Sequence, residues 1–302
     1  MARYVYVLVS SEVDRYAAMC YLSAASVRYA DSSARFTLLT NTETDRWLAK
    51  GNHKLSQVID QVQVVPIEAG NVVASRVLKT TMLQRVQEDF IFLDTDTVML
   101  KPISHRLNET AALAMAEDRF PRHPKPEFPD WVIPLYKQLG WECPTRQYFN
   151  SGVMVVRNNA DSQRLFENWH ERWKTYHKQT GKTHDQPALN SVIHSLNIPV
   201  ETLPLKFNAM VRVDELYRWQ AHVLHFFAEK YALDAGTEYE NLVARVQAGE
   251  FVSGMDIDQA MRKRVPLVEP DSAMRCLKAG NPLLAMQGWV SRKLQRSRGA
   301  QA

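Results

Sequence analysis

The stretch Phe90-Ile-Phe-Leu-Asp94-Thr-Asp96-Thr-Val-Met-Leu100 decides the fold class of this chain. Its first four residues are apolar and predict a short buried strand, which ends in two carboxylates separated by one residue. Because side chains alternate along an extended chain, we expect Asp94 and Asp96 on the same side. Two hard oxygen ligands at the end of a parallel strand suit Mg²⁺ or Mn²⁺, with a phosphate-bearing ligand completing the coordination. A solvated turn leaving a strand is the alternative.

Other short apolar runs precede this stretch and alternate with helical patterns. Tyr4–Val9, Phe36–Leu39 and Val62–Ile67 predict buried strands. Between the strands, apolar residues recur three and four positions apart within Tyr16–Val27 and again within Leu78–Val86, which predicts helices with one buried face. Strand and helix in alternation predict an α/β fold with a mostly parallel central sheet flanked by helices. Ligands of such sheets bind beyond the carboxyl ends of the strands.

The pattern continues beyond residue 100. Ala111–Met115 and Val153–Val156 predict strands, and an aromatic helical face follows Asp161, which we expect to be the N-cap. Five prolines from Pro121 to Pro134 predict a long extended loop.

The last part of the chain is predicted to form a helical segment that follows the α/β domain. Thr237-Glu-Tyr-Glu240 is a capping box that predicts a helix ending near Gly249. We expect a catalytic domain over residues 1–235 and a helical, basic C-terminal appendage over 236–302. From residue 261 onward there are nine basic and two acidic residues. A solvated tail and a weak peripheral contact with an anionic membrane both fit this composition.

Composition excludes several classes of protein. The chain has 302 residues, 45% apolar and 23% charged, which excludes disordered, collagen-like and disulfide-scaffold proteins. Its net charge of +4 is concentrated at the C-terminal end, which argues against nucleic acid as a partner. Cys20, Cys143 and Cys276 lack the spacing of a zinc site and indicate a reducing compartment. Tyr4–Val9 is too short for a membrane span or a signal peptide, so we expect a cytoplasmic protein.

A second motif, Tyr148-Phe-Asn150-Ser-Gly152, precedes a buried strand. Gly152 would let the backbone approach a ligand closely, and the amide of Asn150 offers a donor and an acceptor to sugar hydroxyls. The alternative is a turn closed by asparagine and glycine.

Two later motifs complete the set. In His184-Asp185-Gln186-Pro187 the proline suits the first position of a helix, which places Asp185 and Gln186 at the helix entrance. Asp185 as a mere N-cap is the alternative. The alternating run Ala221–Phe227 points His225 to the same face as two apolar side chains, so it is either a core histidine or a further metal ligand. As a ligand, its imidazole would shift the preference from Mg²⁺ toward Mn²⁺.

Together, Asp-x-Asp, Phe-Asn-Ser-Gly, Asp-Gln-x-x-Leu-Asn and a late His-Phe resemble the family 8 glycosyltransferases, the group that includes glycogenin and bacterial lipooligosaccharide galactosyltransferases. The similarity runs from Tyr4 to about Lys230 in the family's motif order. It implies the GT-A fold, a UDP-sugar donor and transfer of a hexose with retention. The acceptor stays open among a glycan, a lipid-linked saccharide, a protein side chain and a small molecule. The chain departs from the family where Pro187 follows Asp-Gln, where Ala228 replaces a glycine, and where Lys230 comes one residue early.

The resemblance also implies roles for individual residues. Asp94, Asp96 and His225 match the positions that hold Mn²⁺, with Mg²⁺ as the alternative cation. Lys79 matches a basic residue near the donor, and the loop from Val9 to Tyr16 matches the part that receives uracil and ribose. The full set of donor-binding residues that we expect is Ser10, Tyr16, Lys79, Thr95, Asn150, Ser151, Gly152 and Lys230.

The chemistry of glycosyl transfer indicates two candidate catalytic residues. A glycosyl bond to a diphosphate breaks through an oxocarbenium-like transition state, which a carboxylate or amide oxygen facing the anomeric carbon would stabilise. Asp185 and Gln186 are the candidates. Two other classes of protein remain open: a metal-dependent phosphoester hydrolase, which would also use Asp-x-Asp, and a non-catalytic carbohydrate-binding protein that retains the fold alone.

Overall fold

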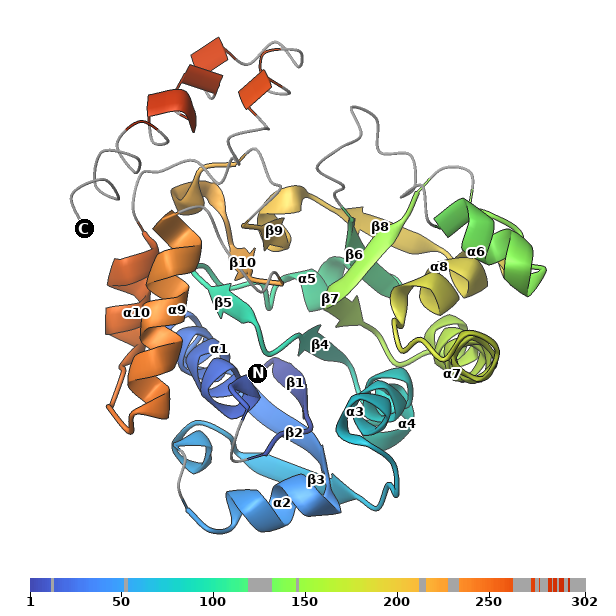
Figure 1. Cartoon of the computed structure of the whole chain (residues 1–302), viewed down its shortest axis with the longest axis horizontal. Helices are drawn as coiled ribbons and strands as arrows, with labels where there is room; N and C mark the ends of the chain where they lie inside the picture. Colours follow the sequence, from blue (N-terminus) through green and yellow to red (C-terminus); the bar gives the residue numbers. More distant parts are fainter. Residues whose placement is uncertain are drawn as a thin grey trace.

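The computed structural model describes residues 1–11, 14–51, 54–118, 132–144, 147–211, 216–227 and 234–262, and separate residues between 273 and 293 (Figure 1). A seven-stranded sheet forms the centre. Its strands, in spatial order, are β3 (Gln61–Val65), β2 (Arg35–Asn41), β1 (Arg3–Leu8), β4 (Phe90–Leu93), β7 (Phe149–Val156), β6 (Leu113–Glu117) and β8 (Val200–Leu203). A second sheet has three short strands, in the order β5 (Thr97–Met99), β10 (Val223–His225) and β9 (Ala209–Met210).

Helices cover both faces of the large sheet. The described α-helices are α1 (Tyr16–Ala30), α2 (Thr42–Leu48), α3 (Asn71–Thr80), α4 (Met82–Arg85), α5 (Arg106–Glu109), α6 (Val132–Leu139), α7 (Ala160–Thr180), α8 (Gln186–Ser195), α9 (Asp234–Gln247) and α10 (Gly254–Met261). Three short 3₁₀ segments are η1 (Leu55–Gln57), η2 (Leu205–Phe207) and η3 (Arg218–Gln220). The expected α/β fold with a mostly parallel sheet is confirmed.

The strand β1 shows why the sheet needs helices on both sides. Alternate side chains of a strand point to opposite faces. Tyr4 and Tyr6 are buried in the hydrophobic core that contains α1, whereas Val5 and Val7 are buried in the core that contains α3, α7 and α8. A strand buried on both faces reads as one continuous apolar run, as this one does.

One change of strand direction positions the functional residues. The strands β3, β2, β1 and β4 are parallel, but β7 runs antiparallel to β4, with Leu93 opposite Val153. The carboxyl end of β4 therefore lies beside the amino end of β7. The backbone N–H of Asp94 donates to the carbonyl of Gly152 at 2.8 Å, which joins two of the predicted motifs directly.

Two predicted boundaries are wrong. The N-cap of α7 is Asn159 and not Asp161, because the Asn159 side chain accepts a hydrogen bond from the Ser162 backbone in a reciprocal capping box. The predicted aromatic face of this helix is nevertheless buried. Pro134 lies inside the first turn of α6 and not in an extended loop. The rest of that predicted loop, over residues 119–131, falls outside the described residues.

The helices α9 and α10 pack on α1, alongside which Figure 1 shows them. Tyr239, Leu242 and Ile257 are buried in the same core as the side chains of α1. The helix α9 begins three residues before the predicted capping box, at Asp234. The division into 1–235 and 236–302 stays a prediction. Among the described residues, no helix is long and apolar enough to cross a membrane.

Candidate active site

A pocket of about 500 Å³ opens at the carboxyl ends of β1 and β4. Its walls come from Val7–Val9, from Asp14 and Arg15 before α1, from Tyr16 and Met19 in α1, from one side of α3, from Asp94–Asp96, and from Phe226 and Phe227. Five predicted site residues line this pocket: Tyr16, Lys79, Asp94, Thr95 and Asp96. The position agrees with the rule that ligands of open α/β sheets bind beyond the carboxyl ends of the strands.

The three predicted metal ligands meet beside this pocket, which Asp94 and Asp96 line. One ligand atom from each of Asp94, Asp96 and His225 lies within 4.8 Å of the other two. The small sheet brings them together, because β10 pairs antiparallel with β5 and sets His225 opposite Thr97. The backbone N–H of Phe226 donates to the Asp96 carbonyl at 2.8 Å and closes the same junction.

The electrostatics of these residues fit a bound cation. Burial raises the pKa of Asp94, and the neighbouring Asp96 carboxylate adds to this effect against the opposing charge of Lys79. Burial alone would lower the pKa of His225, but the Asp96 carboxylate outweighs it and the pKa is raised. Asp96 Oδ1 is buried without a well-aligned hydrogen bond, and His225 Nε2 lies 3.3 Å from it. Two carboxylates and one imidazole around an unsatisfied oxygen are a donor set that suits Mn²⁺ or Mg²⁺.

The side chain of His225 leaves no room for any residue larger than glycine at position 152. A Cβ atom at position 152 would lie 2.8 Å from Nδ1 of His225 and closer still to Cε1 of that ring. The imidazole of His225 fills the space that the missing side chain leaves, and the close approach of a ligand to the Gly152 backbone stays a prediction.

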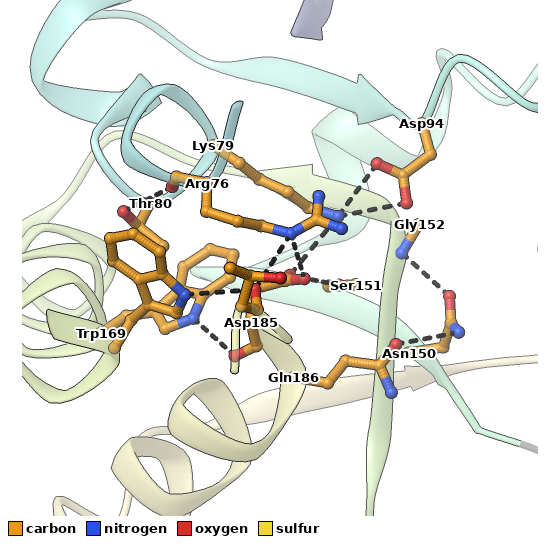
Figure 2. Close-up of polar contacts among 12 residues, drawn as sticks. Arg76, Lys79, Thr80, Asp94, Asn150, Ser151, Gly152, Trp169, Asp185 and Gln186 are labelled. Atoms are coloured by element: carbon orange, nitrogen blue, oxygen red, sulfur yellow. Dashed lines mark hydrogen bonds and ion pairs between the residues drawn. The ribbon is translucent and has the colours of Figure 1, made fainter. Parts of the chain in front are cut away.

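A second group of charges surrounds Asp185 (Figure 2). Lys79 Nζ lies 2.9 Å from Asp94 Oδ1 and 3.5 Å from Asp185 Oδ2, so this buried ammonium group bridges the two acids. Arg76 Nε lies 3.4 Å from Asp185 Oδ1, and Ser151 Oγ donates to Asp185 Oδ2 at 2.8 Å. Although burial opposes ionisation, Lys79 and Arg76 lower the pKa of Asp185 to about 2. Asp185 is therefore ionised at neutral pH.

Asp185 precedes α8, but its side chain makes no capping hydrogen bond. The alternative reading of Asp185 as a simple N-cap side chain is wrong. Its backbone carbonyl accepts a hydrogen bond from Trp169 Nε1 at 3.0 Å, so the buried aromatic face of α7 fixes the residue from behind.

Amide side chains extend the site from Asp185 along β7. Asn150 Nδ2 donates to Gln186 Oε1 at 3.2 Å and reaches Asp118 Oδ1 at 3.4 Å. Gln186 Nε2 donates to Asp118 Oδ2 at 2.6 Å. The predicted residues Asn150 and Gln186 thus share one hydrogen-bonded group with Asp118, and the neighbouring residues Ser151 and Asp185 bond each other.

Two predicted donor-binding residues stay predictions. Ser10 is buried and is not among the residues that line the pocket; its hydroxyl donates to Asp14 Oδ1 at 2.6 Å. Lys230 falls outside the described residues.

Arg76, Asp118 and Asn208 are site residues that sequence reasoning missed. Arg76 carried a usable signal, since it stands three residues before Lys79 and shares its side of α3. Asp118 directly follows β6, and Asn208 lies between η2 and β9. No motif marks either of them.

Comparison with known proteins agrees with this geometry. The family model described as nucleotide-diphospho-sugar transferase matches residues 67–235. A search of curated protein sequences finds no match. Among solved structures, the galactosyltransferase LgtC in complex with donor and acceptor sugar analogues aligns with a TM-score of 0.53 at 17% identity, covering 83% of this chain and 96% of that one.

Two further structures share the fold. Mouse xyloside xylosyltransferase 1 aligns with a TM-score of 0.50 at 14% identity, covering 77% of this chain and 99% of that one. The glycosyltransferase GlyE of Streptococcus pneumoniae aligns with a TM-score of 0.52 at 12% identity, covering 86% of this chain and 63% of that one. With the family match extending over more than half of its length, this chain belongs to the nucleotide-diphospho-sugar transferases and is a GT-A glycosyltransferase of the family 8 type.

Proposed function

We propose that this glycosyltransferase moves a hexose from a UDP-sugar to an acceptor hydroxyl, with retention of anomeric configuration and with Mn²⁺ or Mg²⁺ held by Asp94, Asp96 and His225. The observation that carries the proposal is the meeting of these three ligand atoms, within 4.8 Å of one another, beside a pocket of about 500 Å³. The proposal of retention and of uridine as the base rests on the resemblance to family 8.

Different residues of the pocket would bind different parts of the donor. We assign the nucleotide to the wall formed by Val7–Val9 and Tyr16, whose ring is half exposed at the pocket. A divalent cation in the triad would supply Lewis-acid stabilisation of the departing diphosphate. Lys79 adds a fixed positive charge beside Asp94 that no solvent screens, since its side chain is only 3% exposed.

Asp185 and Gln186 are our candidates for the catalytic oxygens. Positive charge develops at the anomeric carbon in the transition state, and preorganised oxygens stabilise it without further reorganisation. Asp185 is held by Lys79, Arg76 and Ser151, and its low pKa keeps it anionic. The Gln186 amide is held by Asp118 and so presents a defined orientation.

The acceptor candidates are a glycan, a lipid-linked saccharide, a protein side chain and a small molecule. A thermal-shift panel of nucleotide sugars, measured with and without Mn²⁺, tests the donor assignment. A ligand at one hundred times its Kd stabilises the native state by about 2.7 kcal/mol. We expect the largest shift with a UDP-hexose together with Mn²⁺, and equal shifts for all nucleotide sugars would contradict the proposal.

Product analysis separates the alternatives. Transfer releases UDP and leaves a glycosylated acceptor, whereas a phosphoester hydrolase releases phosphate. We expect Asp96→Ala to abolish Mn²⁺-dependent UDP release, and Asp161→Ala, an exposed acid on α7, to serve as the matched control. If the biological activity survives Asp96→Ala, the protein is a non-catalytic binding protein that retains the fold.

We also propose a cytoplasmic protein with a weak peripheral contact at the inner membrane face. The support is the described part of the C-terminal segment, where Leu283, Met286 and Trp289 are each more than half exposed, followed by basic residues in the sequence. Co-sedimentation with anionic liposomes tests this contact. Unchanged co-sedimentation after truncation at Asn281 would remove it.

A further inference from the structure

We propose that Asn208 is a positioning residue, which orients the metal ligand His225 with one end of its amide and the donor-site residue Asn150 with the other. This inference rests on the proposed function. Asn208 is fully buried and lies between η2 and β9. The strand β9 runs parallel to β10, with Met210 opposite His225, so the backbone delivers Asn208 to the imidazole.

The direction of each hydrogen bond follows from one backbone group. The N–H of Gly152 donates to Asn150 Oδ1 at 2.9 Å, and a backbone N–H can only donate. The atom of Asn208 that lies 2.9 Å from the same Oδ1 must therefore be its amide nitrogen, Nδ2. The remaining end of Asn208 is then Oδ1, which can only accept.

This assignment determines the tautomer of His225. Asn208 Oδ1 lies 2.9 Å from His225 Nδ1, so Nδ1 must carry a proton and donate it. In the neutral imidazole the lone pair is then on Nε2, the atom that lies 3.3 Å from Asp96 Oδ1. A metal-binding histidine needs its lone pair on the side of the cation, and the partner of its other nitrogen decides this.

The same amide reaches the sugar side of the site. Asn150, held at Oδ1 by Gly152 and Asn208, directs its Nδ2 at Gln186 Oε1 and Asp118 Oδ1. The two ends of one amide group, that of Asn208, thus orient the metal ligand His225 and the donor-site residue Asn150. Because Asn208 and His225 are both buried, solvent does not substitute for either bond.

Two substitutions separate the two ends. Asn208→Leu is close in size and removes both hydrogen bonds. Asn208→Asp keeps an acceptor for His225 Nδ1 but has no donor for Asn150. Asn41→Leu is the matched control, since it removes an equally buried amide whose side chain accepts from Thr44 in the cap of α2.

The first measurement is Mn²⁺ affinity in the absence of donor, from the electron paramagnetic resonance signal of free Mn²⁺, with circular dichroism to verify folding. We expect Asn208→Leu to weaken Mn²⁺ binding by about 10–100-fold. We expect Asn208→Asp and Asn41→Leu to retain affinity close to that of the wild-type protein. The second measurement is UDP release at saturating Mn²⁺, which we expect Asn208→Asp to lower by about 10-fold or more.

The outcomes distinguish this inference from the proposed function. A wild-type protein that does not bind Mn²⁺ overturns the metal site and the inference with it. If the wild-type protein binds Mn²⁺, either of two results overturns only the orientation of His225 by Asn208. In the first, Asn208→Leu binds Mn²⁺ as tightly as the wild-type protein. In the second, Asn208→Asp binds Mn²⁺ as weakly as a folded Asn208→Leu. If Asn208→Asp releases UDP at the wild-type rate, the link to Asn150 is overturned. This measurement remains valid even if Asn208→Leu does not fold.

Discussion

The substitution Gly152→Ala tests the contact on which the metal site depends. Its new Cβ would lie 2.8 Å from His225 Nδ1 and closer still to Cε1, whereas ordinary contact begins at 3.4 Å, so the ring must retreat by at least about 0.6 Å. The hydrogen bond from Nδ1 to Asn208 is 2.9 Å long, and a displacement of the ring by this amount weakens it. Overpacking costs about 1–3 kcal/mol and a weakened buried hydrogen bond about 1 kcal/mol. We expect the free energy of unfolding to fall by about 2–4 kcal/mol.

Chemical denaturation measures that change, and Mn²⁺ titration of the folded variant measures its effect on the site. We expect Mn²⁺ affinity to fall by about 10–100-fold, because the imidazole is displaced from the carboxylates. Gly70→Ala is the control, since a Cβ there meets nothing within 4 Å and its φ of −58° suits any residue. A Gly152→Ala protein with wild-type stability and wild-type Mn²⁺ affinity would refute the close approach of the ring.

Three further predictions concern other parts of the chain. Asp185→Asn leaves buried Lys79 with one acid fewer, so we expect chemical denaturation to detect a loss of about 3–5 kcal/mol and UDP release to fall with it; unchanged values for both would contradict the charge group. Gly254→Ala would push its Cβ against Tyr29 and the backbone of α1, so we expect a loss of about 1–3 kcal/mol in one cooperative unfolding transition, whereas a separate early transition would show that α10 unfolds independently. Burial lowers the pKa of His222 to about 4, below its usual value of about 6.5, so the unfolded state binds the proton more tightly and stability should fall as the pH drops from 6.5 toward 4. Denaturation midpoints should fall less in His222→Gln, and equal slopes in both proteins would refute this account.

The strands of the large sheet were predictable where burial on both faces makes the sequence continuously apolar. The strands β1, β2 and β4 were found for this reason, to within two residues at each end. The strand β8 was missed, because its middle residues, Glu201 and Thr202, are exposed and polar and break the apolar run. The strands β5 and β9 have three and two residues, too few for any periodicity to appear.

The site was predictable only as separate pieces. Each motif named its own residues, but the meeting of Asp96 with His225 depends on the β5–β10 pairing, a contact between distant segments that local patterns do not encode. The same holds for Asn208, because the sequence around it carries no motif. Its role depends on the orientation of its amide, which the hydrogen bond from the Gly152 backbone N–H to Asn150 determines. Ser10 shows what a local pattern leaves open, since its hydroxyl in the predicted binding loop bonds Asp14, a residue that lines the pocket.

The reversal of direction between β4 and β7 has a consequence for how this chain tolerates length changes. Adding one residue inside Val153–Val156 would either turn Asn150 to the opposite face of the sheet or force a bulge beside the triad, even though every helix kept its place. At the other end of β7, Asn158 and Asn159 lead into the cap of α7, and an added residue there would disturb this cap and not the triad. We therefore expect natural insertions and deletions to accumulate at that end and to be absent from the four residues that hold the two halves of the site in step.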